Sequence, residues 1–319
     1  ANIYMDCMMR EVLRRHPKLG IAFQYRLDGR WLDAEDMTYE TRIACLMYAD
    51  DCALFASSEA DLQQLYYTLA IVFKADGMLI SMAKTEAAVY RAWISASSWL
   101  EPDIIHADLS KVKETTAFKY LGQYKERQGA RKETGARIGS AQEAWRSLRS
   151  KLFRCKRLAL QLRIRLYTCL VTSRLLSAGE TIPFNKTELR RMEATQTSHL
   201  RQIQFVPYSA HVPNAPVRRT CKVPTVESRL REARLRIWGQ ACRDSPHSFF
   251  RATMFGHAAD ARPKKNLGVT YISLIQEAVQ HFWQYAIQLR DWSLDPDLLL
   301  DAQDMHYAAT VKEWPNSHW

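Results

Sequence analysis

The pattern of apolar and polar residues divides the first part of the chain into short elements. Apolar side chains recur at helical spacing between residues 1 and 15, which predicts one helix. A strand is expected at residues 21–25, and an apolar pair at residues 31–32 follows the turn dipeptide Asp28-Gly29. The chain is therefore predicted to begin with a helix and a small hairpin.

A second hairpin is expected immediately afterwards. Two short apolar runs, residues 43–48 and residues 52–56, are separated by Ala49, Asp50 and Asp51. Apolar strands joined by so few residues predict a tight turn. This turn would present two acidic side chains at its tip.

The segment after this hairpin is predicted to contain a helix and further strands. Apolar residues after a serine cap recur at three- and four-residue spacing until Gly77 closes the helix. Strands are expected at residues 78–80 and 87–90, and a turn or hairpin at residues 118–122. Hairpins and a helix in this order predict an α+β fold, an antiparallel sheet with helices on one face.

Beyond about residue 130 the strand pattern stops. Apolar residues from Ala141 to Leu162 alternate between four- and three-residue spacing, which predicts one amphipathic helix with a basic outer face. Further helices are expected at residues 161–178, 186–203, 225–243, 269–291 and 296–312. Pro207, Pro213 and Pro216 predict a loop between two of these helices.

The change of pattern divides the chain into three parts. We expect a partial α+β domain at residues 1–128, a helical region at residues 129–245 and a helical C-terminal extension at residues 246–319. The first residue is Ala1, and the sequence opens directly in a helical pattern. We therefore expect the chain to be an excerpt of something longer.

Positive charge is concentrated at the start of the helical region. The chain has a net charge of +11, and residues 125–165 hold 13 basic and 3 acidic residues, a difference of +10. Such clustering favours a polyanion, most commonly nucleic acid, over a merely solvated helix face. The candidate nucleic-acid-binding residues in this stretch are Arg131, Lys132, Arg146, Arg149, Lys151, Arg154 and Arg157.

Several other classes of protein are not favoured. No segment approaches the roughly 20 apolar residues of a membrane-spanning helix, and charged residues interrupt the first fifteen positions, unlike a secretory signal. The seven cysteines are scattered and form no Cys-x-x-Cys pair. We expect an intracellular protein of the nucleus or cytoplasm, with no membrane and no disulfide-linked partner.

Asp50 and Asp51 are the strongest candidates for chemistry. Two-metal nucleotidyl transfer needs carboxylates that hold divalent ions about 4 Å apart, and Mg²⁺ (or Mn²⁺) prefers such oxygen ligands. A hairpin tip suits this task, because the flanking strands anchor the acids at the rim of a sheet. The alternative is a pair of solvated turn residues, which is what most Asp-Asp pairs are.

The surrounding sequence resembles that of reverse transcriptases. Leu46-Met47-Tyr48-Ala49-Asp50-Asp51 is similar to their catalytic hairpin. The glycine turn at Gly77, followed by Lys84-Thr85, resembles the next block of the family, and Phe118-Lys119-Tyr120-Leu121-Gly122 resembles the element that contacts the primer end. Downstream segments, including Leu235-Arg236-Ile237-Trp238-Gly239-Gln240, resemble the helical region of non-LTR (LINE-type) retrotransposon enzymes.

The resemblance assigns roles to individual residues. Asp50 and Asp51 would be catalytic metal ligands, and Tyr48 would lie near the incoming nucleotide or primer end. Lys84 would be a catalytic residue that faces the triphosphate or donates a proton to pyrophosphate, with an exposed strand-edge lysine as the alternative. Tyr120 and Gly122 would seat the primer, although a core tyrosine and a turn glycine explain them almost as well.

The same resemblance implies an architecture and partners. Residues 1–128 would be a partial polymerase palm, residues 129–245 a helical thumb and connector, and residues 246–319 an extension of unknown role. The partners would be an RNA template, a DNA primer and deoxynucleoside triphosphates.

The sequence departs from the family at its start. The family pattern places a further aspartate and a template-binding helix upstream of the hairpin, and Asn2-Ile3-Tyr4-Met5-Asp6 is similar only to the end of that helix. We therefore distinguish a fragment of an RNA-directed DNA polymerase from two alternatives. One is a catalytically inactive remnant that binds nucleic acid, and the other is a helical interaction protein without a nucleic-acid role.

Overall fold

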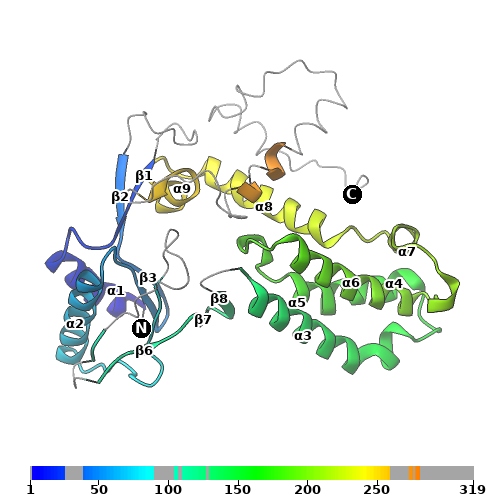
Figure 1. Ribbon diagram of the computed structural model, residues 1–319, viewed down its shortest axis with the longest axis horizontal. Helices are drawn as coiled ribbons and strands as arrows, with labels where there is room; N and C mark the ends of the chain where they lie inside the picture. The colour runs from blue at the N-terminus through cyan, green and yellow to red at the C-terminus, as the bar shows by residue number, and fades with distance from the viewer. Residues whose placement is uncertain are drawn as a thin grey trace, which may run out of the picture. The chain divides into compact units, whose positions relative to one another are not determined.

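The computed structural model describes residues 2–25, 39–89, 104–106, 110–126, 129–258, 273–275 and 277–280. These residues divide into two compact units, and Figure 1 labels most of their helices and strands. The first unit contains the described residues up to Phe118 and those from Ala241 to residue 258. The second contains Lys119–Gln240 and the helical stretch near residue 275. Each unit has its own hydrophobic core.

The first unit is α+β, as the sequence predicts. Its helices are α1 (Asn2–Arg15), α2 (Glu59–Ala75) and α9 (Phe249–Phe255). Its strands are β1 (Ile21–Tyr25), β2 (Tyr39–Ile43), β3 (Cys45–Tyr48), β4 (Asp51–Leu54), β5 (Glu86–Ala87), β6 (Lys113–Glu114) and β9 (His257–Ala258). They form small sheets in the orders β2-β1-β9, β3-β4 and β5-β6.

Helices α1 and α2 build the core of the first unit against the β3–β4 hairpin. Met5, Met8 and Val12 of α1 meet Leu65 and other apolar residues of α2, all of them buried. Ser58 caps α2 by accepting the backbone N–H of Asp61, as expected. Gly77 follows the end of α2 with a φ of +76°, so the predicted helix and both of its boundaries are confirmed.

The first hairpin differs from the prediction. Strand β1 is present at the predicted residues, but its described antiparallel partner is β2, with Ile21 opposite Ile43. The expected second strand at residues 31–32 lies outside the described residues. On its other edge β1 pairs with β9, where Gln24 lies opposite His257. Patterns along the sequence give no sign of this pairing, because it joins residues far apart in the chain.

Residues 78–80 are not a strand, so that prediction is wrong. Met78 and Ile80 pack against the core, whereas Leu79 is 85% exposed. An alternating pattern is therefore present, but no described strand pairs with it. Of the strand expected at residues 87–90, Ala87 belongs to the short strand β5, whose partner β6 is parallel. Residues 88–89 are not in a strand, and residue 90 lies outside the described residues.

A third hairpin joins the two units along the chain. Strands β7 (Ala117–Tyr120) and β8 (Gln123–Glu126) pair with each other, as predicted. Their two-residue loop has positive φ at both positions, 48° at Leu121 and 81° at Gly122. This is the type I′ geometry that matches the twist of paired strands and favours glycine.

The second unit is mostly helical (Figure 1). Its α-helices are α3 (Arg131–Leu148), α4 (Leu160–Tyr167), α5 (Ser173–Leu176), α6 (Lys186–Ile203), α7 (Asn214–Cys221) and α8 (Val226–Arg243). Its other helical turns are η2 (Arg149–Phe153), η3 (Thr168–Thr172), η4 (Gly179–Thr181) and η5 (Tyr208–Ala210). The helices expected at 161–178, 186–203 and 225–243 are confirmed, while most of those expected after residue 268 lie outside the described residues.

The single helix expected from Ala141 to Leu162 is wrong. Helix α3 ends at Leu148 and continues as the π-helical turn η2, after which the chain bends before α4. The wider π turn brings Phe153 into the core, where its ring stacks on Trp145 with centroids 5.0 Å apart. Leu162, the last residue of the expected apolar stripe, is instead 43% exposed.

The loop predicted around three prolines contains a helix. Helix α7 begins at Asn214, so Pro216 occupies its first turn. Proline is tolerated there, because the first N–H groups of a helix have no partner within it.

The described residues contain no helix that is both long and apolar enough to cross a membrane. The predicted domain boundaries at residues 128 and 245 stay predictions.

Aromatic stacking organises the core of the second unit. Trp145 lies between Phe153 and His199, and the His199 ring is stacked on it at 4.3 Å. The hydroxyl of buried Tyr167 lies 3.2 Å from Nδ1 of His199. Burial lowers the pKa of His199 to about 4, so the ring is neutral in this core at neutral pH.

We expect Gly20→Ala to destabilise the first unit strongly. Gly20 has a φ of +108°, and an added Cβ would lie 2.6 Å from the carbonyl oxygen of Ile43. A clash with backbone at a left-handed position should lower the free energy of unfolding by about 3 kcal/mol, measured by urea denaturation. Gly135→Ala, in α3 with open space around it, is the matched control. It should raise stability by about 0.5–1 kcal/mol, and equal effects of the two variants would contradict a clash at Gly20.

Acid should destabilise the second unit through His199. Its folded pKa of about 4 lies below the ordinary value of 6.5, so the unfolded chain binds the proton first. Stability should therefore fall as the pH drops from 6.5 to 4, by about 3 kcal/mol for a shift of this size. His199→Gln removes the titrating group. Urea denaturation over this pH range should show a weaker pH dependence in the variant, and parallel curves would refute the assignment.

Candidate functional site

The β3–β4 hairpin places two acidic residues at a tight turn, as the sequence predicts. Met47 lies opposite Cys52 and Tyr48 opposite Asp51, so only Ala49 and Asp50 form the loop. Ala49 has a φ of +54°, a conformation that costs an alanine more than a glycine. The hairpin therefore holds its tip in a strained, tightly defined geometry.

The two faces of this hairpin differ in character. Cys45, Met47, Cys52 and Leu54 pack on the core formed by α1 and α2. Because strand side chains alternate between faces, Tyr48 and its cross-strand neighbour Asp51 point the other way. Tyr48 is 66% exposed. The acidic tip and its tyrosine thus form one solvent-facing surface on a buried support.

Asp50 and Asp51 are available to a cation. Both residues are exposed, and within the described part of the chain neither carboxylate takes part in a hydrogen bond or ion pair. Burial raises the pKa of the neighbouring Cys52 thiol to about 12, so this cysteine stays protonated and is a poor metal ligand. Oxygen ligands from the two aspartates are what the hairpin offers to a metal.

These two carboxylates are an incomplete ligand set for a pair of metal ions. The described residues include no group of three or more histidine, cysteine, aspartate or glutamate side chains that could hold a metal. The carboxylate oxygens of the hairpin are the type of ligand that Mg²⁺ prefers. Two acids alone, however, provide only part of a two-metal site.

Lys84 is not brought to the hairpin by any described contact. It lies in the exposed turn at residues 82–84, after α2, where its backbone N–H donates to the carbonyl of Ser81. Leu79 and Met82 nearby are also exposed. The catalytic role predicted for this lysine stays a prediction.

Tyr120 and Gly122 belong to the β7–β8 hairpin. Tyr120 is half-buried at the end of β7, and Gly122 occupies the second position of the turn. An added Cβ at Gly122 would meet nothing within 4 Å, so backbone conformation favours glycine there and close packing does not. The turn-glycine explanation is thus sufficient for Gly122, and the primer contact stays a prediction.

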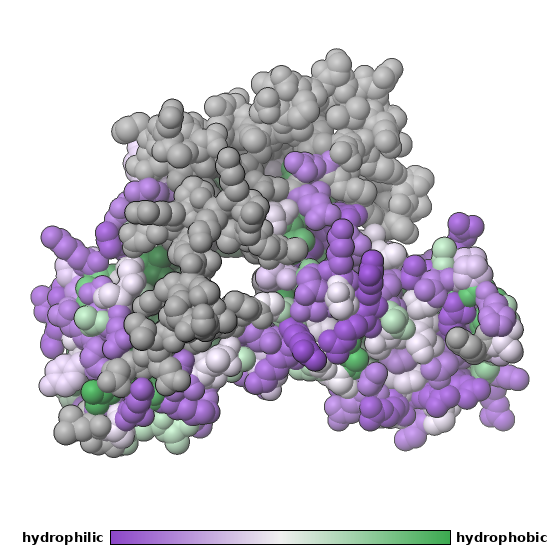
Figure 2. Space-filling model, in the orientation of Figure 1, coloured by the Kyte–Doolittle hydropathy of each residue, from purple (hydrophilic) through white to green (hydrophobic). Residues whose placement is uncertain are grey.

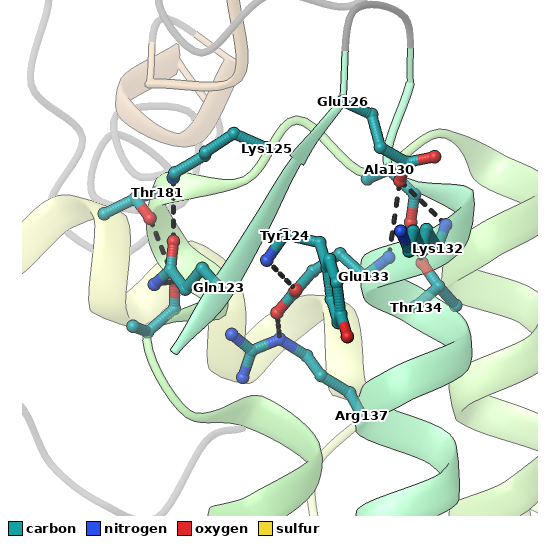
Figure 3. Close-up of polar contacts among 11 residues, drawn as sticks. Gln123, Tyr124, Lys125, Glu126, Ala130, Lys132, Glu133, Thr134, Arg137 and Thr181 are labelled. Carbon is teal, nitrogen blue, oxygen red and sulfur yellow. Dashed lines mark hydrogen bonds and ion pairs between the residues drawn. The ribbon is translucent and has the colours of Figure 1, made fainter. Parts of the chain in front are cut away.

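Strand β8 is tied to the start of α3 by carboxylates (Figure 3). Glu126 accepts the backbone N–H of Lys132 at 2.7 Å, which satisfies a free donor of the first helical turn. Buried Glu133 accepts the backbone N–H of Tyr124 at 2.6 Å and is paired with buried Arg137. The turn that carries Gly122 is therefore anchored to the helical unit.

The predicted nucleic-acid-binding residues of the helical unit lie on its surface. Figure 2 shows mostly hydrophilic residues over the visible face of this unit. The exposed members are Arg131, Lys132, Arg146, Arg149, Lys151, Arg154 and Arg157. They do not share one helix face, because Arg154 and Arg157 lie in the bend that follows η2.

Two basic residues of this stretch have a different role from the one their charge suggested. Arg137 and Arg163 are 7% and 8% exposed. Arg137 pairs with Glu133, and Arg163 donates to backbone carbonyls of the bend and of α6. Counting charges along the sequence did not separate them from the surface residues. The glutamate four positions before Arg137 was the one available signal.

Comparison with known proteins identifies the part of the chain that contains the hairpin. Residues 1–124 match the family model described as reverse transcriptase (RNA-dependent DNA polymerase). Neither a curated protein nor a solved structure matches the chain. The match includes α1, the β3–β4 hairpin, α2 and β7, and thus Tyr48, Asp50, Asp51, Lys84, Tyr120 and Gly122. Residues 1–124 are therefore a reverse transcriptase domain.

Proposed function

We propose that this chain is part of an RNA-directed DNA polymerase of a non-LTR retroelement. The observation that carries the proposal is the pair Asp50-Asp51 on the exposed two-residue turn of β3–β4, within a segment that matches reverse transcriptases. Template and primer binding follows from the family. The non-LTR subtype rests on the sequence resemblance alone.

In this proposal the hairpin is the metal-binding wall of the active site. Asp50 is a direct ligand, and Asp51 supports the site from the exposed face that it shares with Tyr48. When bound, Mg²⁺ would activate the primer hydroxyl and stabilise the leaving pyrophosphate. The chain's own contribution is positional, because the buried face of the hairpin fixes where both carboxylates stand.

Tyr48 has a positioning role in the same site. Its ring is exposed next to Asp51, where it can contact a nucleotide or the primer end. Lys84, with no described partner for its side chain, is proposed to face the triphosphate. Seven exposed basic residues at the start of the helical unit are proposed to hold the template–primer backbone, which requires charge and no sequence readout. They are Arg131, Lys132, Arg146, Arg149, Lys151, Arg154 and Arg157.

A second candidate is a nucleic-acid-binding protein without polymerase activity. The observation that favours it is the incomplete ligand set: the described residues provide two carboxylates at the hairpin and no third ligand beside them. The basic surface would then be the functional part of the chain. The polymerase requires Asp50 as a metal ligand, whereas the nucleic-acid-binding protein does not require Asp50 for its function.

Metal binding tests the hairpin in this chain directly. At millimolar Mn²⁺, paramagnetic broadening in NMR spectra should be strongest at the amides of residues 48–52 of the β3–β4 turn. Asp50→Asn with Asp51→Asn should remove this effect, because the oxygen ligands lose their charge. Asp76→Asn, which changes an exposed acid at the end of α2, should leave the broadening intact. Broadening at the turn that survives the double substitution would reject the metal role.

Primer extension tests the polymerase itself. The complete gene product that contains this chain is assayed. It should extend a DNA primer on an RNA template only when Mg²⁺ is present. Asp50→Asn should slow extension by about a thousandfold or more, because a catalytic metal contributes several kcal/mol to the transition state.

The same assay separates the two candidates. Asp76→Asn should extend primers at the wild-type rate. A folded protein that binds the template–primer but extends nothing, with binding unchanged by Asp50→Asn, would reject the polymerase and leave the binding protein.

A further inference from the structure

One end of the helical unit collects positive charge around a single aromatic ring. The guanidinium carbon of Arg154 lies 5.6 Å from the centre of the Phe205 ring, the Nζ of Lys156 lies 5.4 Å from it, and the guanidinium carbon of Arg163 lies 5.2 Å from it. These are cation–π distances. We call Arg154, Lys156 and Phe205, with Arg163 beneath them, the Phe205 cluster.

Phe205 adopts a backbone conformation that phenylalanine does not favour. It directly follows the C-cap of α6, with a φ of +59°. Its N–H donates to the carbonyl of Gln202, and the N–H of Val206 donates to that of Arg201, the bonds of a Schellman motif. Glycine or asparagine is usual at this position. A large aromatic ring there costs backbone strain, which suggests that the ring itself is needed.

Arg163 fixes the position of the ring. It is buried, and its guanidinium donates to the carbonyls of Leu158 at 3.1 Å, Phe153 at 3.3 Å and Ile203 at 2.6 Å. These carbonyls come from the end of η2, from the bend after it and from the last turn of α6. One buried cation therefore joins the segment that carries Arg154 and Lys156 to the segment that carries Phe205.

No acidic residue of either segment neutralises this end of the unit. The sequence has no aspartate or glutamate between Glu143 and Glu180, or between Glu193 and Glu227. In the described part of the chain, Arg154 and Lys156 are exposed and form no ion pair. Neighbouring Arg149, Lys151 and Arg157 are likewise exposed and have no ion pair there. Like charges held together without a counter-charge create a positive potential that favours an anionic partner.

We propose that the Phe205 cluster is a binding site for the phosphodiester backbone of nucleic acid. The inference rests on the proposed function, which supplies a nucleic-acid partner, and it names where the helical unit holds that partner. Arg154 and Lys156 would donate hydrogen bonds to phosphate oxygens, while the Phe205 ring keeps the two cations side by side. Such contacts hold a strand without reading its bases.

The test measures binding of the full chain to a fluorescently labelled RNA–DNA hybrid. The readout is fluorescence anisotropy over a salt series, without metal ions or nucleotides, so the result does not depend on polymerase activity. Arg154→Gln with Lys156→Gln should raise the Kd about tenfold at 0.1 M salt. It should also reduce the slope of log K against log salt by nearly two, because about 0.9 counterion is released per phosphate contact.

Two further variants make the result specific. Arg190→Gln with Arg191→Gln removes the same charge from exposed positions of α6 and should change neither the Kd nor the slope. Phe205→Leu keeps an apolar side chain but removes the ring, and should raise the Kd several-fold with the slope unchanged, because the cations remain.

Several outcomes would overturn the proposal. Equal losses in the two double variants would mean that only overall charge matters. An unchanged salt slope in the Arg154 and Lys156 variant would mean that these two residues do not contact phosphate. A Phe205→Leu protein that binds like wild type would mean that the ring does not contribute to the site. Binding through Arg154 and Lys156 to phosphatidylserine vesicles, with none to the hybrid, would assign the cluster to a membrane surface instead.

Discussion

Apolar packing of one face of the β3–β4 hairpin determines where the acidic turn stands. Alternate residues of both strands lie against α1 and α2, and the opposite face is left to solvent. Because the period of a strand is two, a shift of one residue would exchange the two faces and bury the acids. The chemistry proposed for Asp50 and Asp51 thus depends on methionine, leucine and cysteine side chains that never meet a substrate.

The helical unit uses a different device for the same purpose. Its core is a stack of rings, in which the π turn η2 brings Phe153 beneath Trp145. The turn and the bend after it leave carbonyl groups without helical partners, and the buried guanidinium of Arg163 donates to them. Packing in the core and the arrangement of cations at the surface are therefore linked through one arginine.

Local signals explain what the sequence could predict. Helix α6 begins and ends at the predicted residues, and Asn185 and Glu188 form a capping box at its start. The β3–β4 hairpin could be predicted because the residues that separate its two apolar runs are too few to form any connection other than a tight turn. In both cases neighbouring residues alone decide the structure. The reverse transcriptase assignment also came from short motifs in a fixed order, and the family match over residues 1–124 agrees with it.

Long-range packing explains what the sequence could not predict. The apolar spacing from Ala141 to Leu162 continues through the bend, and only the fit of Phe153 under Trp145 shows why the helix stops. Leu79 has the pattern of a strand residue without a described strand to pair with. The Phe205 cluster gave no signal either, because a positive φ at a phenylalanine leaves no trace in composition or periodicity.

The return of the chain to β1 has a consequence for the architecture of the molecule. Strand β9 and helix α9 belong to the first unit, although Lys119–Gln240 of the helical unit precede them in sequence. Along the chain, that stretch therefore lies between two segments of the first unit. A single proteolytic cut at either junction would leave it connected, and a protein shortened before residue 249 would expose the edge of β1 that β9 covers.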